Sequence, residues 1–210
     1  MIMTFIYLHG FASHPQSAKA KYLRDRFTSI GLNLQIPDLN QDDFSHLTIS
    51  RQVKQVANLL PSKTDSVTLI GSSLGGLTAA ILAQDYLQID RLILLAPAFN
   101  FLSHWLPKLG DEKLDRWQSE KYLPVYHSYE QKHLPLNYNF INDARQYEKL
   151  PFSRSLPTLI IHGINDETIP INSSREFANT RPWVELIELD SDHALGNSMG
   201  KIWKIIKPFC

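Results

Sequence analysis

Two observations predict an α/β fold with a mostly parallel sheet of about six strands and helices on both faces. Short runs rich in β-branched and apolar residues alternate along the chain with longer segments of helical periodicity. These runs are apolar almost throughout, which is typical of parallel strands buried on both faces. Strand–helix alternation of this kind characterises layered α/β domains, so we expect a single such domain over residues 1–210.

The strands are predicted where apolar and β-branched residues follow one another for about five positions. In chain order these runs are residues 4–8, 33–37, 66–70, 91–96, 158–162 and 184–189. The helices are predicted where apolar residues recur at helical spacing, at 17–30, 48–60, 74–87, 171–179 and 196–207. The helix that starts at residue 74 is too apolar to face water, so we expect it to be buried against the sheet.

Residues 101–156 interrupt this alternation. A segment this long between two strands is usually a functional lid or an insertion, so we expect a cap or lid at about 101–156. Within it, residues 124–129 and 134–138 are predicted to pair as a hairpin across 130–133, and residues 142–150 to form a helix. Its aromatic residues either line an acyl pocket or give the segment a core of its own. They are Trp105, Trp117, Tyr122, Tyr126, Tyr129, Tyr138, Phe140 and Tyr147.

The composition argues against several classes of protein. Basic and acidic residues number 21 each, so the chain has no net charge. This balance, without a basic stripe, argues against nucleic acid or an anionic membrane as the main partner. The single cysteine, Cys210, excludes an internal disulfide and a cysteine-based zinc site and suits a cytoplasmic location. The first residues, MIMTFIYLHGFA, lack the basic start of a signal peptide, and no stretch is long enough to span a bilayer.

Ser73 is the strongest candidate for a catalytic nucleophile. It lies in Gly71-Ser72-Ser73-Leu74-Gly75-Gly76, directly after a predicted strand and directly before a predicted helix. A Gly-x-Ser-x-Gly turn at such a junction holds the serine on a strained bend with its Oγ exposed at the top of the sheet. The backbone N–H of Leu74 then points to where an oxyanion would form. Ser72 is expected to point back into the sheet.

Two other interpretations of this motif remain. The bare pattern is short enough to arise by chance, so an inert turn is the first alternative. The second is a phosphate-binding loop, because residues 71–78 fit G-x-x-x-x-G-K-[ST] except at Leu77, which stands where the lysine should be. The charge that would meet the phosphates is therefore missing.

Two residues are predicted to complete a triad with Ser73, since a serine needs a base and the base needs an orienting acid. In an open parallel sheet, such groups gather at the carboxyl ends of strands. Asp166 follows the strand at 158–162 and is the predicted acid; the alternative is an aspartate that only caps a turn. His193 follows the last predicted strand and is the predicted base; the alternative is an exposed loop histidine.

Other candidates for these roles are less well placed. Asp190 and Asp192 flank His193, but an acid one residue before a histidine can hardly reach that imidazole's Nδ1, because adjacent side chains diverge. His9 and His162 also end strands, but each precedes a glycine in a tight turn. We therefore expect these two histidines to fix loop geometry.

His9-Gly10-Phe11 ends the first predicted strand. The glycine allows a turn that presents the backbone N–H of Phe11 beside that of Leu74, so these two groups form the predicted oxyanion hole. The tripeptide alone is a weak signal. Its position at the end of the first predicted strand is what favours a role in the oxyanion hole.

Together these motifs resemble the α/β-hydrolase superfamily over nearly the whole chain. His9-Gly10-Phe11 is followed by the turn at Ser73, by Asp166 within HGINDETIP and by Asp192-His193, in the superfamily's order of nucleophile, acid and histidine. The short chain and the stretch YLHGFASHPQSAKAKYL are similar to the small bacterial YqiA/YcfP-like esterase branch. The leading antiparallel strands usual in the superfamily are absent.

The resemblance implies a serine hydrolase, without cofactor or metal, that cleaves small-molecule carboxylic esters. Because the 101–156 insertion is too small for a large lid, we expect it to limit the acyl group to short or medium chains. Ser73 would attack the acyl carbon, His193 would accept its proton and deliver it to the leaving alcohol, and Asp166 would orient the imidazole. The alternatives are a thioesterase, a peptidase or a carbon–carbon bond hydrolase on the same fold, or a non-catalytic ligand-binding homologue.

Overall fold

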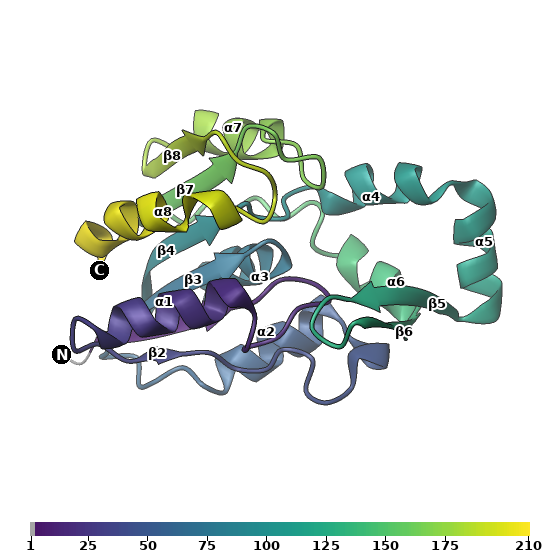
Figure 1. Ribbon diagram of the computed structural model, residues 1–210, viewed down its shortest axis with the longest axis horizontal. Coiled ribbons are helices and arrows are strands. Elements are labelled where there is room, and N and C mark those ends of the chain that lie inside the picture. Colours follow the sequence, from purple (N-terminus) through teal and green to yellow (C-terminus); the bar gives the residue numbers. More distant parts are fainter. Residues whose placement is uncertain (1–2) are drawn as a thin grey trace.

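A computed structural model describes residues 3–210 and has a six-stranded parallel sheet at its centre (Figure 1). The strands lie in the order β2-β1-β3-β4-β7-β8, so the chain runs outward from β1 in both directions. Their bounds are β1 Met3–Leu8, β2 Leu34–Gln35, β3 Ser66–Ser72, β4 Ile89–Leu95, β7 Thr158–Gly163 and β8 Val184–Leu189. The predicted fold class, number of strands and parallel pairing are confirmed.

Helices cover both faces of this sheet, as predicted. Outside residues 101–156 they are α1 (Ala18–Thr28), α2 (Ile49–Ala57), α3 (Leu74–Asp85), α7 (Asn172–Asn179) and α8 (Met199–Ile206), with 3-10 turns at Phe44–His46, Gly196–Ser198 and Lys207–Phe209. Side-chain caps fix two of their starts, because the hydroxyls of Ser17 and Thr48 accept the N–H groups of Ala20 and Arg51. Over residues 3–210, every helix falls short of the length and apolar character that crossing a bilayer demands.

Alternate side chains of the strands supply two hydrophobic cores. In β1, Phe5 and Tyr7 point to one face and Ile6 and Leu8 to the other, since successive side chains of a strand point in opposite directions. α1 and α8 cover the face of Phe5 and Tyr7, and α2 and α3 cover the opposite face (Figure 1). α7 also packs, through Phe177, against the core on the α2 and α3 face.

Most elements differ from the predicted ranges by a few residues at their ends, and β2, β3 and α8 show why. β2 is shorter than the predicted 33–37, because it lies at the sheet edge and Pro37 has no N–H to donate to a ladder. The predicted helix 196–207 is shorter as well, since its first turn is 3-10 helix. β3 is longer than predicted and extends to Ser72, because its last residues still pair with β4. The rigid sheet therefore reaches to the residue before Ser73.

Residues 101–156 lie between β4 and β7 and extend beyond the main sheet (Figure 1). They form α4 (Phe101–Leu109), α5 (Asp111–Glu120), β5 (Tyr122–His127), β6 (Lys132–Asn137) and α6 (Asn139–Arg145). β5 and β6 pair antiparallel, as the predicted hairpin does, and α6 begins and ends earlier than the predicted 142–150. The helices α4 and α5 are not predicted from the sequence, because Pro107 inside α4 and Gly110 between them interrupt the helical pattern.

Two glycines allow the backbones of β1, β3 and α3 to pack in direct contact. A Cβ atom at Gly75 would overlap the carbonyl oxygen of Leu8, and a Cβ atom at Gly71 would overlap the backbone of Gly75. Backbone atoms in a packed sheet cannot move aside as a side chain can, so only glycine fits at both positions. This contact brings the end of β3 and Ser73 next to the end of β1.

We expect Gly75→Ala to lower the free energy of unfolding by about 1–3 kcal/mol, as overpacked interior substitutions do. Gly200→Ala is the matched control, since a Cβ atom at exposed Gly200 in α8 would meet no atom within 4 Å. There, alanine should leave stability unchanged or raise it by up to about 1 kcal/mol. Urea unfolding followed by circular dichroism measures both variants, and equal effects would contradict the packing argument.

Candidate active site

Ser73 occupies the turn between β3 and α3. Its φ of 54° and ψ of −119° lie outside the regions that residues with a Cβ atom favour, as expected for a serine on a strained strand-to-helix bend. Its N–H donates to the carbonyl of Leu95 at 2.9 Å, and its carbonyl accepts the N–H of Ala98 at 3.0 Å. The end of β4 therefore holds the turn in this conformation.

Three side chains predicted from separate parts of the sequence come together here. His193 Nε2 lies 3.0 Å from Ser73 Oγ, and His193 Nδ1 lies 2.6 Å from Asp166 Oδ2. His193 follows β8, and Asp166 follows β7. A carboxylate can only accept, so Nδ1 carries a proton and the Nε2 of the neutral ring is free to accept the proton of Ser73.

Asp166 accepts hydrogen bonds on both carboxylate oxygens. Its Oδ1 accepts the N–H groups of Thr168 and Ile169, each at 2.8 Å, and its Oδ2 also lies 3.0 Å from His162 Nε2. Burial raises the pKa of this fully buried carboxyl, but the hydrogen bonds from His162 and His193 outweigh it and hold the pKa well below its usual range. Asp166 is therefore a carboxylate that can orient His193.

His162 contributes more than the loop geometry expected of it, because it contacts Asp166 itself. Its Nε2 faces two acceptors, Asp166 Oδ2 and the carbonyl of Ile169, each at 3.0 Å, and so carries the proton. Its Nδ1 lies 2.7 Å from the hydroxyl of Ser174. The ring is wholly buried and holds the carboxylate in place. The sequence signal for this contact is the spacing of four residues between His162 and Asp166 across one turn.

The predicted oxyanion-hole residues, Phe11 and Leu74, flank Ser73. Leu74 is the first residue of α3, so its N–H has no acceptor within the helix. The loop after β1 approaches the serine closely, since a Cβ atom at Gly10 would lie 3.2 Å from Ser73 Cβ. His9 fixes this loop, as expected, because its Nε2 accepts the N–H of Leu39 at 2.9 Å. The site thus lies between β1 and β3, where the strand order reverses and α/β sheets usually bind ligands.

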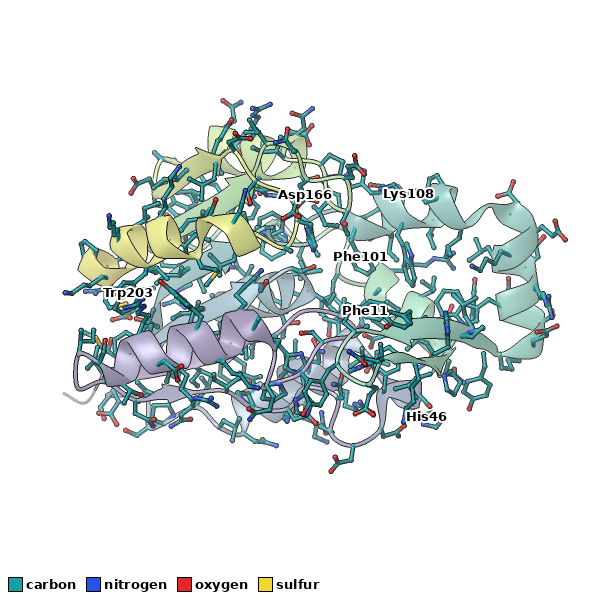
Figure 2. The ribbon with its side chains drawn as sticks, in the orientation of Figure 1. Phe11, His46, Phe101, Lys108, Asp166 and Trp203 are labelled. Atoms are coloured by element: carbon teal, nitrogen blue, oxygen red, sulfur yellow. The ribbon has the colours of Figure 1, made fainter. Side chains whose placement is uncertain are left out.

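Two cavities meet at Ser73. The aromatic cavity, of about 380 Å³, is lined by Phe101, Trp105 and Phe140 together with Phe11 and Leu74. Phe11 and Phe101 lie where the 101–156 segment approaches the ends of the strands, and Asp166 lies near them (Figure 2). The second cavity, of about 620 Å³, lies on the side of His193 and is called the hydroxyl-rich cavity here, because Ser13, Ser17, Tyr22, Ser72 and Ser128 line it.

The aromatic residues of this segment divide between a cavity wall and the hydrophobic core. Trp105 lines the aromatic cavity, whereas Trp117 is buried behind it, with ring centroids 5.6 Å apart and its N–H donated to the carbonyl of Leu136. Tyr126 and Tyr129 are exposed and belong to neither group. The buried residues of the segment therefore extend the hydrophobic core on the α2 and α3 face of the sheet and support the cavity wall.

The expectation that Ser72 points back into the sheet is wrong. Its side chain lies on the α1 face, where its hydroxyl accepts a hydrogen bond from Lys19 Nζ at 2.9 Å and lines the hydroxyl-rich cavity. β3 ends at Ser72, so apolar packing no longer covers the sheet at this position. Lys19 carries no motif in the sequence that would mark it as a site residue. Within residues 3–210, no group of three or more His, Cys, Asp or Glu side chains is arranged to hold a metal ion.

Comparison with known proteins identifies a family and a fold. The chain matches the model of an uncharacterised protein family, UPF0227, over residues 4–210. A search of curated proteins gave no match.

Among solved structures, the chain is similar to a protein from Agrobacterium vitis S4, with a TM-score of 0.82 and 24% identity over 98% of this chain and 87% of that chain. It is also similar to Est1E from Butyrivibrio proteoclasticus with ferulic acid bound, with a TM-score of 0.79 and 18% identity over 99% and 88% of the two chains. For alpha/beta hydrolase domain-containing protein 10 from mouse, the TM-score is 0.74, with 22% identity over 99% and 90%. These likenesses confirm the α/β-hydrolase fold that the sequence motifs predict.

We expect Asp166 to make the stability of the folded chain depend on pH in the acid range. The pKa of this carboxyl is lower in the folded chain than the ordinary value of about 3.9 in an unfolded chain, so unfolding at low pH takes up a proton. The stabilisation is complete above about pH 5 and is lost as the pH falls below about 4. Urea unfolding between pH 3 and 7 should show a flatter dependence for Asp166→Asn, by up to about one proton. An unchanged slope would contradict the charged state assigned to Asp166.

Proposed function

The chain belongs to the UPF0227 family and has the α/β-hydrolase fold, and from this premise we propose that it is a serine hydrolase that cleaves carboxylic esters through an acyl-enzyme. The observation that carries the proposal is the hydrogen-bonded chain from Ser73 through His193 to Asp166, at the point where two cavities meet. This arrangement has the nucleophile, base and orienting acid that ester hydrolysis requires.

The proposed reaction uses each of these groups in turn. Ser73 Oγ attacks the ester carbonyl while His193 Nε2 accepts its proton, and Asp166 stabilises the resulting imidazolium. The N–H groups of Phe11 and Leu74 hold the oxyanion. His193 then delivers the proton to the leaving alcohol. Water attacks the acyl group with His193 as base, and the carboxylic acid leaves Ser73 free.

The two cavities suggest where each part of the ester binds. The aromatic cavity contains both oxyanion-hole residues and has mostly apolar walls, with Lys108 and Glu167 as its charged lining residues, so it suits the acyl group. Its volume of about 380 Å³ lies in the lower part of the range for small-molecule sites, which favours short to medium acyl chains. His193 lines only the other cavity, so the leaving alcohol that it protonates belongs there. The 101–156 segment supplies walls to both cavities, and we propose that it acts as the cap of a single domain.

A fluorophosphonate probe is the direct test of the nucleophile. We expect it to label Ser73, with loss of both labelling and p-nitrophenyl butyrate hydrolysis in Ser73→Ala, because the Ser73 hydroxyl has His193 beside it and lies where both cavities meet. Ser173→Ala is the control, since the Ser173 hydroxyl also lies 3.0 Å from a histidine ring, that of His104, but outside both cavities at Ser73. Labelling that persists in Ser73→Ala would rule out the assignment.

Trp105 should limit the length of the acyl chain. Trp105→Ala enlarges the aromatic cavity, so kcat/KM for p-nitrophenyl octanoate should rise relative to that for the butyrate, by up to about fourfold for each methylene newly accommodated. Trp203→Ala is the control, because Trp203 lies in α8 and packs against Phe27 at the other end of the molecule (Figure 2). If Trp105→Ala, like the control, leaves the ratio of octanoate to butyrate kcat/KM unchanged, Trp105 has only a packing role.

A further inference from the structure

We propose that the hydroxyl-rich cavity selects a leaving alcohol or phenol that carries an anionic group, and that Lys19 binds this anion. The inference rests on the proposed function, because it concerns the part of the ester that His193 would protonate. Lys19 and Ser73 line the same cavity, on the His193 side of the nucleophile. A group attached to the leaving oxygen therefore extends from Ser73 toward Lys19.

The charge of the cavity favours an anion. Among the described residues that line it, Lys19 is the only Lys, Arg, Asp or Glu, and most of the other polar groups are hydroxyls. An ammonium has three N–H donors, and Lys19 donates one of them to Ser72 Oγ at 2.9 Å. The remaining donors and the nearby hydroxyls can hold a carboxylate.

The position of Lys19 has no evident structural reason. Burial lowers its pKa to about 8, and the negative charges of Asp192 and Asp166 raise it only in part. Neither carboxylate forms an ion pair with Lys19 among residues 3–210. A half-buried lysine without an ion pair is costly to desolvate, and such groups concentrate at functional sites. An anionic ligand would supply the missing partner.

The walls of the cavity are fixed by contacts between distant parts of the chain. The turn between β5 and β6 closes the side opposite α1, because the N–H of Ser128 donates to the carbonyl of Ala12 at 3.1 Å. In the same turn, the ring of Tyr129 stacks on that of His14, with centroids 3.9 Å apart. The 101–156 segment thus shapes the leaving-group cavity as well as the aromatic one.

The test compares release of butanoate from 4-(butanoyloxy)benzoate, which is an anion, and from its neutral methyl ester. Lys19→Met should lower kcat/KM for the carboxylate by about 10- to 100-fold, the effect of losing one hydrogen bond to a charged group, and should change the neutral ester much less. Lys19→Arg keeps the charge and should retain most of the preference. Lys21→Met is the matched control, since Lys21 is exposed on the same helix. It should leave both esters unchanged.

The pH dependence gives a second measurement. The preference for the carboxylate should fall between pH 7 and pH 9.5, because Lys19 loses its proton near pH 8. The other charged groups that act on Lys19 are the carboxylates of Asp192 and Asp166, and His193 serves both esters as the base. Tyr22 and Tyr7 also face the cavity. Burial raises the pKa of Tyr7 well above its usual range, so Tyr7 stays neutral in this experiment.

The outcomes separate this inference from the proposed function. If wild-type protein cleaves the neutral ester but Lys19→Met lowers both rates equally, Lys19 only supports the turn at Ser73 and the inference is wrong. If wild-type protein cleaves neither ester and the fluorophosphonate probe does not label Ser73, the proposed function fails, and the inference with it.

Discussion

The candidate site depends on how a single buried carboxylate is held. Asp166 accepts two backbone N–H groups on one oxygen and two histidine rings on the other. These bonds keep it charged in a place where burial alone would favour the neutral acid. They also join the loop after β7 to the loop after β8, so the imidazole of His193 can reach Ser73 from a fixed direction.

The backbone of the turn between β3 and α3 places the Ser73 hydroxyl beside the imidazole of His193. Glycine at positions 71 and 75 lets β3 and α3 pack directly against each other and against the end of β1, and the bonds from the end of β4 hold the strained turn. Because the strand order reverses between β1 and β3, the loop with Phe11 opens beside the serine and leaves space on both sides. Phe11 and Ser73 line both the aromatic cavity and the hydroxyl-rich one, an arrangement that suits an ester with two chemically different halves.

The sequence predicts the elements whose patterning is local. Buried strands such as β4 and β7 are continuous apolar runs, and the positions of Ser73, Asp166 and His193 at the carboxyl ends of strands follow from the fold class. Contacts that depend on side-chain direction at the end of a strand were not predictable. The bond between Ser72 and Lys19 depends on which face of the sheet the last side chain of β3 occupies. The bond between His162 and Asp166 depends on the path of the turn that joins them. The helices α4 and α5 are not predictable from apolar periodicity, because Pro107 and Gly110 interrupt it.

The most direct test of the central claim, that Asp166 is the orienting acid, is kcat for two matched amide variants. Asp166→Asn should keep the geometry but favour the wrong imidazole tautomer, and so lower kcat by about 10³- to 10⁴-fold. Asp192→Asn should have a far smaller effect, because Asp192 is exposed and its Oδ1 accepts the N–H of Leu195, a bond that asparagine can also make. A larger loss of kcat in Asp192→Asn than in Asp166→Asn would contradict this account.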